Sequence, residues 1–366
     1  MKEVLVVFLV WITSINLFAF TAFHRFNLTG DTAYNWTSRY FLPARDTDFF
    51  SLHERWDSYW YLDIAEHGYS FHSGDSLSNV AFFPLYPFLI RISTPIFFGQ
   101  ANIAGWFISA VSLLLVLIYF YKLIKRFHPN INPHLVLVFL LLFPTAFFLN
   151  AIYTESLFLF LSIAAFYYMF SKNLLLSGIF GFLASVTRPS GVYLFIPLLW
   201  EYYRQNSSIR ALFRKESLFV FLTPLGFAVT LLIDYLLFRD PLLFFKVEGW
   251  WGRGFNLRSV YINLFSQPSV VNFACDVSFF FFAAAAAYFL FKNIRTSYGL
   301  YVLVTILPAI ASGTLLSIGR YILVLFPIYI LLASIKNKYI QALVLFNFSL
   351  YLAMFTTLFV NYYWTG

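Results

Sequence analysis

The strongest constraint on this chain is a series of apolar runs that are long enough to cross a lipid bilayer. Residues 4–23 contain no charged side chain, and a helix of about 20 apolar residues spans the hydrocarbon core. Similar runs recur at 102–121, 133–149, 151–170, 173–187, 190–203, 217–238, 271–291, 297–312, 320–335 and 339–360. Because only structures that satisfy all their backbone hydrogen bonds are stable in lipid, this pattern predicts an all-α polytopic membrane protein with about 11 transmembrane helices.

Composition narrows the classes of function. Hydrophobic residues make up 61% of the chain and charged residues only 11%, whereas about 25% of residues are charged in a soluble domain. The net charge of +8 indicates membrane orientation and contact with anionic membrane lipids, so no nucleic-acid partner is expected. The single cysteine, Cys275, excludes an intramolecular disulfide, and the sequence has no glycine-rich nucleotide loop. We therefore expect no nucleotide-driven chemistry and no cofactor.

The distribution of charge predicts how the spans are oriented. Short cytoplasmic loops carry an excess of Lys and Arg, and an N-terminus inside the cell places the short basic loops on that side. The basic residues of these loops are Lys2, Lys122, Lys125, Arg126, Lys172, Arg204, Arg210, Arg214, Lys215, Lys292, Arg295, Lys336 and Lys338. Of the 16 acidic residues, only Glu3, Glu201 and Glu216 fall on the same side. We expect the chemistry on the acidic outer face.

Two long segments, 24–101 and 239–270, fall on that outer face within a single membrane domain that covers 1–366. Within the first, 81–98 is apolar but contains two prolines and Arg91. A charge at the bilayer centre costs about 2.5–3.5 kcal/mol, and counting this run as a span would invert every later loop. A re-entrant or interfacial helix is therefore expected there.

The stretch Arg55–Tyr69, RWDSYWYLDIAEHGY, combines acidic, basic and aromatic residues more densely than any other part of the chain. In a helix, successive residues turn by about 100°. One face of such a helix would carry Asp57, Trp60, Tyr61 and Ile64. Another face would carry Asp63, Glu66 and His67. A helix that only lies on the membrane surface, with its aromatic residues among the lipid headgroups, is the alternative.

Three ionisable residues, Glu155, Arg188 and Arg320, occur at membrane depth near the outer ends of predicted spans. Such residues are functional candidates, although a glutamate that pairs with an arginine can simply hold two helices together. If the substrate is a lipid-linked phosphosugar, its phosphate needs fixed cationic donors. Arginines suit this role because the guanidinium group matches phosphate geometry. The candidates are Arg55, Arg188, Arg253 and Arg320.

Transfer of a sugar from such a phosphate needs no ATP, because cleavage of the phosphate ester at the anomeric carbon drives the reaction. The transfer does need a carboxylate that removes the proton of the acceptor hydroxyl. Asp57 is the first candidate for this base, and Asp63 or His67 is the alternative. A divalent metal ion held by Asp57, Asp63 and Glu66 would have suitable oxygen ligands, but helical spacing separates Asp57 from the other two.

Several motifs together resemble one family. RWDSYWYLDIAEHGY followed by NVAFFPLYPFLIR resembles the signature of the PIG-V family of GPI mannosyltransferases and their prokaryotic relatives. FPTAFFLNAIYTESLF, ASVTRPSG, the WGR within GWWGRGF, and GRYILVLFP resemble further motifs of that family in the same order. The resemblance implies a GT-C type membrane glycosyltransferase that takes mannose from a polyprenyl-phosphate donor, with its catalytic aspartate at Asp57. It also implies donor or acceptor contacts for Arg55, Asp63, His67, Glu155, Arg188, Trp251, Arg253 and Arg320.

The preferred hypothesis is an inverting glycosyltransferase with Asp57 as its base and Glu66 among the supporting residues. It would transfer mannose, or a similar hexose, to a lipid-linked or protein acceptor on the extracytoplasmic face. The length of the chain favours a bacterial or archaeal homologue that acts in the cell membrane on an acceptor other than GPI. A lipid or solute transporter is the alternative. The sequence has no paired interrupted helices in matching halves, and its polar residues crowd one face instead of the midplane.

Overall fold

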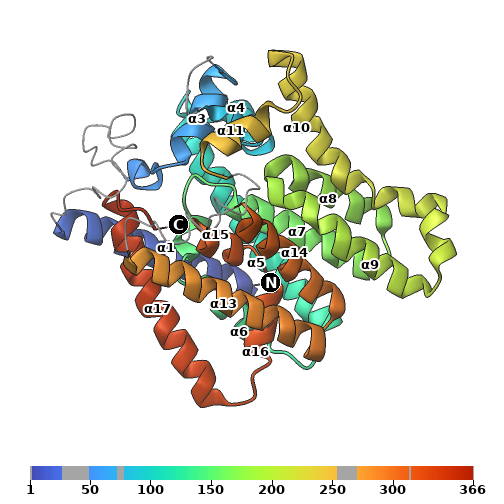
Figure 1. Cartoon of the computed structure of the whole chain (residues 1–366). Helices are drawn as coiled ribbons and strands as arrows, with labels where there is room; N and C mark the ends of the chain where they lie inside the picture. Colours follow the sequence, from blue (N-terminus) through green and yellow to red (C-terminus); the bar gives the residue numbers. More distant parts are fainter. Residues whose placement is uncertain (1, 27–48, 72–77, 254–269, 313–314, 366) are drawn as a thin grey trace.

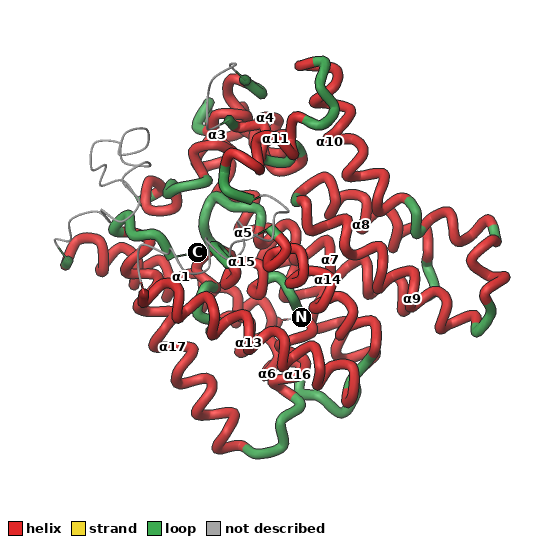
Figure 2. Tube along the Cα trace, viewed as in Figure 1, coloured by secondary structure: helices red, strands yellow, loops and turns green. Residues whose placement is uncertain are grey.

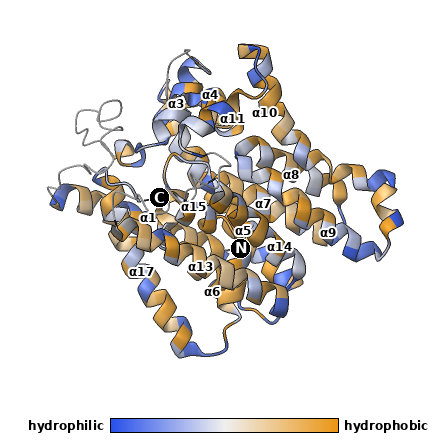
Figure 3. Ribbon diagram, viewed as in Figure 1, coloured by the Kyte–Doolittle hydropathy of each residue, from blue (hydrophilic) through white to orange (hydrophobic). Residues whose placement is uncertain are grey.

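The computed structural model describes residues 2–26, 49–71, 78–253, 270–312 and 315–365. Within these ranges the chain is helical and has no β-strand (Figure 1; Figure 2), which confirms the all-α prediction. The two predicted outer segments are described only in part, since 27–48, 72–77 and 254–269 lie outside these ranges. Figure 3 shows apolar residues along the helices and hydrophilic residues gathered mainly at helix ends and in loops.

Five helices in the described part of the chain are long and apolar enough to cross a membrane. They are α1 (Lys2–Arg25), α5 (Ala101–Phe127), α10 (Leu222–Phe238) with the turn before it, α13 (Val270–Asn293) and α17 (Lys338–Val360). The longest, α5, has 27 residues and is about 40 Å long at 1.5 Å per residue. Their length and composition are those of an integral membrane protein.

Shorter helices and turns complete the bundle. They are α7 (Glu155–Phe170), α8 (Leu174–Thr187), η5 (Pro189–Leu194), α9 (Phe195–Asn206), η6 (Ile209–Phe213), η7 (Lys215–Phe219) and α14 (Thr296–Ala311). Helix α7 packs against both α5 and α8 (Figure 1), and its Phe158, Ile163 and Phe166 are fully buried. A helix that is apolar on all sides belongs inside a bundle.

Two of the predicted spans, 133–149 and 320–335, are not continuous helices. In the first, α6 (Pro133–Leu141) ends before Pro144, and a separate turn, η4 (Ala146–Leu149), follows. In the second, α15 (Ile318–Leu323) is separated from α16 (Pro327–Ala333). Proline lacks the N–H that continues a helix and clashes with the turn before it, so a helix ends ahead of a proline or begins at one. Those two predictions of unbroken helix were wrong, and the total of 11 spans stays a prediction.

Glycines allow α8 to approach the segment η7–α10 closely. A Cβ atom placed on Gly178 would lie 1.9 Å from the carbonyl oxygen of Phe219, and one on Gly226 would lie 2.3 Å from that of Phe182. Small residues at helix contacts let backbones pack closely within a membrane. This tight packing fixes the end of α8, from which Arg188 projects.

A group of short helices lies together at one end of the bundle (Figure 1). It consists of η1 (Phe50–His53), α3 (Ser58–His67), η2 (Asn79–Ala81), α4 (Leu85–Ser93), η3 (Thr94–Phe97) and α11 (Leu243–Trp250). Helix α3 packs against α4, and η2 contacts both α3 and α11. Helix α4 has 9 residues and is about 14 Å long, too short to cross a bilayer, as expected for 81–98.

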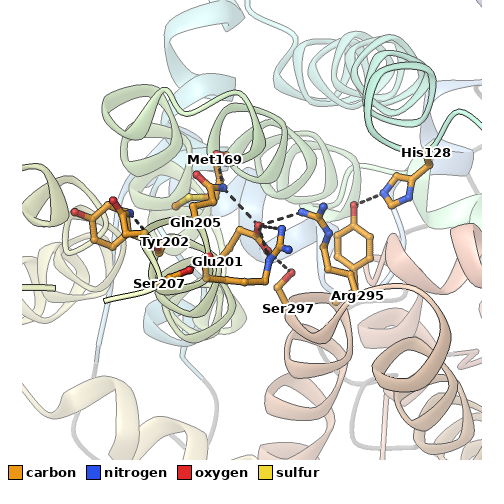
Figure 4. Close-up of polar contacts among 11 residues, drawn as sticks. His128, Met169, Glu201, Tyr202, Gln205, Ser207, Arg295 and Ser297 are labelled. Carbon is orange, nitrogen blue, oxygen red and sulfur yellow. Dashed lines mark hydrogen bonds and ion pairs between the residues drawn. The ribbon is translucent and has the colours of Figure 1, made fainter. Parts of the chain in front are cut away.

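A buried ionic cluster fixes the start of α14 to α9 (Figure 4). The side chain of Glu201 is fully buried and accepts hydrogen bonds from Arg204 Nη2 at 2.7 Å, Arg295 Nη1 at 3.1 Å and Ser297 Oγ at 3.0 Å. A buried carboxylate is tolerated only when it is fully paired in this way. The cluster thereby joins the C-terminal helices to the rest of the bundle.

Candidate active site

A cavity of about 500 Å³ lies where residues of α3, α11, α15 and the segment after α17 meet. Its walls combine charged and aromatic side chains that are far apart in the sequence. They include Asp57, Tyr61, Phe82, Phe83, Arg188, Glu248, Trp250, Trp251, Arg253, Ser317, Arg320, Tyr321 and Trp364. Volume and lining are those of a site for a small polar molecule.

Asp57 reaches the cavity from the turn that precedes α3. Trp56 adopts a φ of +55°, a left-handed conformation that costs a non-glycine residue about 1–2 kcal/mol. Tyr153 supports this turn, because its hydroxyl donates to the Arg55 carbonyl at 2.9 Å and accepts from the Asp57 backbone N–H at 3.2 Å. The Asp57 carboxylate therefore projects from a fixed backbone.

Asp57 belongs to a chain of four charged side chains. Its Oδ2 accepts a hydrogen bond from Arg320 Nη1 at 2.5 Å, and Arg320 Nε donates to Glu155 Oε1 at 2.9 Å. Nη1 of Arg188 lies 2.8 Å from the same Glu155 oxygen. Two arginines thus balance two carboxylates. Glu155 is fully buried, whereas the Asp57 side chain is 15% exposed, so Asp57 is the carboxylate of this chain that is open to the cavity.

Helix ends position two members of this charge chain, Glu155 and Arg188. Glu155 is the first residue of α7, and Arg188 directly follows α8. The helix dipole favours a negative charge at an N-terminus and a positive charge at a C-terminus. The local fold therefore stabilises both charges before they pair with each other.

Arg253 supplies another positive charge to the cavity, from the chain just after α11. Its Nη1 lies 3.3 Å from Glu248 Oε2. Tyr321 and Glu248 together raise the pKa of the Arg253 guanidinium above its usual value. Arg253 is therefore a permanent cation, suited to a phosphate.

A second cavity of about 250 Å³ adjoins the first. The two share Pro189, Glu248, Arg253, Leu316 and Tyr321. The rest of the second cavity is lined by the apolar side chains of Phe244, Phe245 and Pro308 and by the hydroxyl groups of Ser190, Tyr193, Thr305 and Ser312. Arg253 and Glu248 therefore stand at the boundary between the two cavities.

Aromatic rings form much of the wall of the larger cavity. The ring of Trp251 is 6.1 Å from that of Trp60 and 6.0 Å from that of Phe82, and Trp364 is 5.1 Å from Trp56. Aromatic side chains offer large apolar faces, and tryptophan adds an N–H donor. Such surfaces suit a sugar, which has apolar C–H faces and polar edges.

Arg55 does not line the cavity, although the sequence predicted a contact with substrate. Its guanidinium is fully buried and donates to the backbone carbonyls of Val360 at 3.2 Å, Glu54 at 2.8 Å and Ser51. The ring of Tyr362 lies 4.0 Å away. Arg55 therefore joins the turn that carries Asp57 to the end of α17 through these hydrogen bonds.

Asp63, Glu66 and His67 also lie outside the cavity lining. Residues 58–67 are helical, and these three side chains are on the face that points away from Asp57. Asp63 accepts a hydrogen bond from Asn79 at 2.7 Å and pairs with His67 at 3.2 Å, while the His67 side chain is 73% exposed. Their contacts stabilise the short helices.

The same placement separates the ligands of the alternative metal site, because Asp57 faces the cavity while Asp63 and Glu66 do not. In the described ranges, no group of three or more His, Cys, Asp or Glu side chains is arranged to hold a metal ion. The positively charged side chains that line the cavity are Arg188, Arg253 and Arg320.

Several residues of the site were not predicted from the sequence. Glu248 and Trp250 lie just before the WGR motif, and the resemblance that pointed to this motif could have included them. Tyr153 lies inside the motif that drew attention to Glu155. Nothing in the sequence indicated a role for Trp364 in the site, since a tryptophan just after an apolar helix is typical of a membrane interface.

The geometry agrees with a comparison against known families. A family model described as mannosyltransferase (PIG-V) matches residues 2–239, a range that includes Asp57, Glu155 and Arg188. No curated protein matches the chain. The matched range covers more than half of the sequence, and the charged cavity lies between it and the C-terminal helices. The chain is therefore a member of the PIG-V mannosyltransferase family of membrane glycosyltransferases.

Proposed function

We propose that this protein is an inverting mannosyltransferase that takes mannose, or a similar hexose, from a polyprenyl-phosphate donor and transfers it to a lipid-linked or protein acceptor. The observation that carries the proposal is one cavity that holds the Asp57 carboxylate together with Arg188, Arg253 and Arg320. A base for a hydroxyl and cations for a phosphate are the two requirements of this reaction.

In the proposed reaction, Asp57 accepts the proton of the acceptor hydroxyl. The acceptor oxygen forms a bond to the anomeric carbon from the face opposite the phosphate, and the bond between that carbon and the phosphate oxygen breaks. The electron pair of the broken bond stays on the polyprenyl phosphate, which leaves as the anion. A single displacement of this kind inverts the anomeric configuration.

Arg320 would orient Asp57 for this step, since it holds Oδ2 at 2.5 Å. No described residue donates to Oδ1, which leaves that oxygen for the acceptor. Arg188 and Arg253 would bind the leaving phosphate, on which negative charge grows as the bond breaks. These arginines take the place that a metal ion has in many phosphate-cleaving enzymes, so we propose a reaction without cofactor or metal.

The charge pattern supports an active site on the extracytoplasmic face, because the positive-inside rule favours the short loops rich in Lys and Arg in the cytoplasm. We propose the cell membrane of a prokaryote as the location. We place the start of the donor's hydrocarbon tail in the second cavity, beside Arg253, against Phe244, Phe245 and Pro308.

The test is a transfer assay with the purified protein in liposomes, using radiolabelled polyprenyl-phosphate mannose and an extract of membrane lipids as acceptor. We expect a mannosylated product whose anomeric configuration is opposite to that of the donor. Movement of the donor across the bilayer without any change in its mass would contradict the proposal and favour the transporter.

A further inference from the structure

The segment that follows α17 forms part of the cavity wall. Asn361 ends the helix, and Tyr362 has a φ of +66°, so the chain reverses there. The backbone N–H of Tyr363 donates to the Leu358 carbonyl at 2.9 Å, which closes the turn. Trp364 then reaches the cavity that contains Asp57. This segment lies far beyond the residues that match the family model.

Three contacts hold this segment against the turn that carries Asp57. The Val360 carbonyl accepts a hydrogen bond from Arg55 Nε at 3.2 Å, and the Tyr362 ring stacks 4.0 Å from the Arg55 guanidinium. The Trp364 ring meets the Trp56 ring edge to face, at 5.1 Å and 88°. The partners in these contacts, Arg55 and Trp56, are the two residues before Asp57 in the sequence. Trp364 is therefore fixed relative to the proposed base.

We propose that Trp364 is a sugar-contacting residue that packs against a pyranose ring bound in the cavity. This inference rests on the proposed function. A tryptophan presents the largest aromatic face of any side chain, and the position of Trp364 is set by its contact with Trp56 instead of by substrate, so little entropy is lost on binding. The pyranose ring that it contacts belongs either to the hexose of the donor or to a sugar of a lipid-linked acceptor, since a pyranose from either source has an apolar C–H face.

The test compares Trp364→Phe with Trp364→Leu in the full-length protein. Phenylalanine keeps an aromatic face, whereas leucine keeps only apolar bulk. Dissociation constants are measured for two probes, polyprenyl-phosphate mannose for the donor side and octyl mannoside for the acceptor side. We expect Trp364→Leu to weaken one probe by about tenfold, or about 1.4 kcal/mol, and Trp364→Phe to retain most of the affinity. The probe that weakens identifies which sugar Trp364 contacts.

Trp200→Leu is the matched control, since Trp200 lies on α9 outside the cavity lining and is 39% exposed. It should bind both probes as the wild type does. Thermal unfolding of each variant separates loss of the fold from loss of the contact. Wild-type affinity of Trp364→Leu for both probes, or equal losses in the Phe and Leu variants, would overturn the role of Trp364 alone. Failure of the wild type to bind either probe would overturn the proposed function as well.

Discussion

At the scale of single residues, the site depends on Arg320, which holds two carboxylates at once. One edge of its guanidinium contacts Asp57 and the other contacts Glu155. Glu155 is also paired with Arg188, so one buried acid contacts two cations and Asp57 supplies the second negative charge. Removing one member of a buried ion pair leaves its partner charged and unpaired in a medium of low polarity.

We predict that Glu155→Gln destabilises the protein by about 3–5 kcal/mol, because it leaves Arg188 and Arg320 with a single balancing carboxylate. The thermal unfolding midpoint in detergent should fall clearly. Glu66→Gln is the control, since Glu66 is exposed and its loss should change stability by less than about 0.5 kcal/mol. Equal midpoints for the two variants would show that the buried charge chain contributes nothing to stability.

A second prediction concerns His53, which is buried in η1 outside the membrane spans. Burial, and then the nearby Arg55, lower the pKa of His53 from 6.5 to about 3. Between these values the unfolded chain binds a proton that the folded protein does not, so stability falls as the pH drops from about 6.5 towards 3. Unfolding midpoints measured across this range should show the decline.

The variant His53→Phe should show a shallower decline, because it removes the group that titrates only in the unfolded chain. If the unfolding midpoint of His53→Phe declines with pH as steeply as that of the wild type, groups other than His53 cause the loss of stability in acid.

At the scale of elements, the sequence predicted helical structure correctly but did not predict where the helices are interrupted. The spacing of Asp57 and Tyr61 correctly placed both on the cavity side of α3. Apolar length alone suggested unbroken spans at 133–149 and 320–335, but the prolines within them end or restart the helices. The second break matters for function, because it leaves Arg320 on the short helix α15.

Close packing of α8 gives a prediction at this scale. Gly178→Ala would place a Cβ 1.9 Å from the backbone oxygen of Phe219, and such overpacking costs about 1–3 kcal/mol. We expect a lower unfolding midpoint and reduced transfer activity, since α8 carries Arg188 at its end. Gly249→Ala is the control for the unfolding midpoint only, because its Cβ would meet no atom within 4 Å, whereas Gly249 lines the second cavity. An unfolding midpoint of Gly178→Ala equal to that of the wild type would show that the contact between α8 and η7 is loose enough to accept a methyl group.

At the scale of the whole molecule, the site exists only because distant segments converge on it. The sequence could predict that Glu155, Arg188 and Arg320 would meet, since all three are charges at the same predicted depth. It could not predict that Arg55 would turn away to bind backbone carbonyls, because its charge and its neighbours are those of a phosphate ligand. Nor could it predict Trp364, whose position depends on the turn after α17 and on its contact with Trp56.

The central claim is that Asp57 is the base of a transferase, and the most direct test is transfer by Asp57→Asn beside Asp63→Asn. Loss of a general base lowers the rate by about 10²–10⁴-fold. We predict a loss of this size for Asp57→Asn with donor binding largely retained, and near wild-type transfer for Asp63→Asn. The unfolding midpoint of Asp57→Asn should fall, because Arg188 and Arg320 then keep only Glu155 as a balancing carboxylate, so transfer is measured well below that midpoint. Wild-type transfer by Asp57→Asn would contradict the claim, as would an equal loss in the two variants.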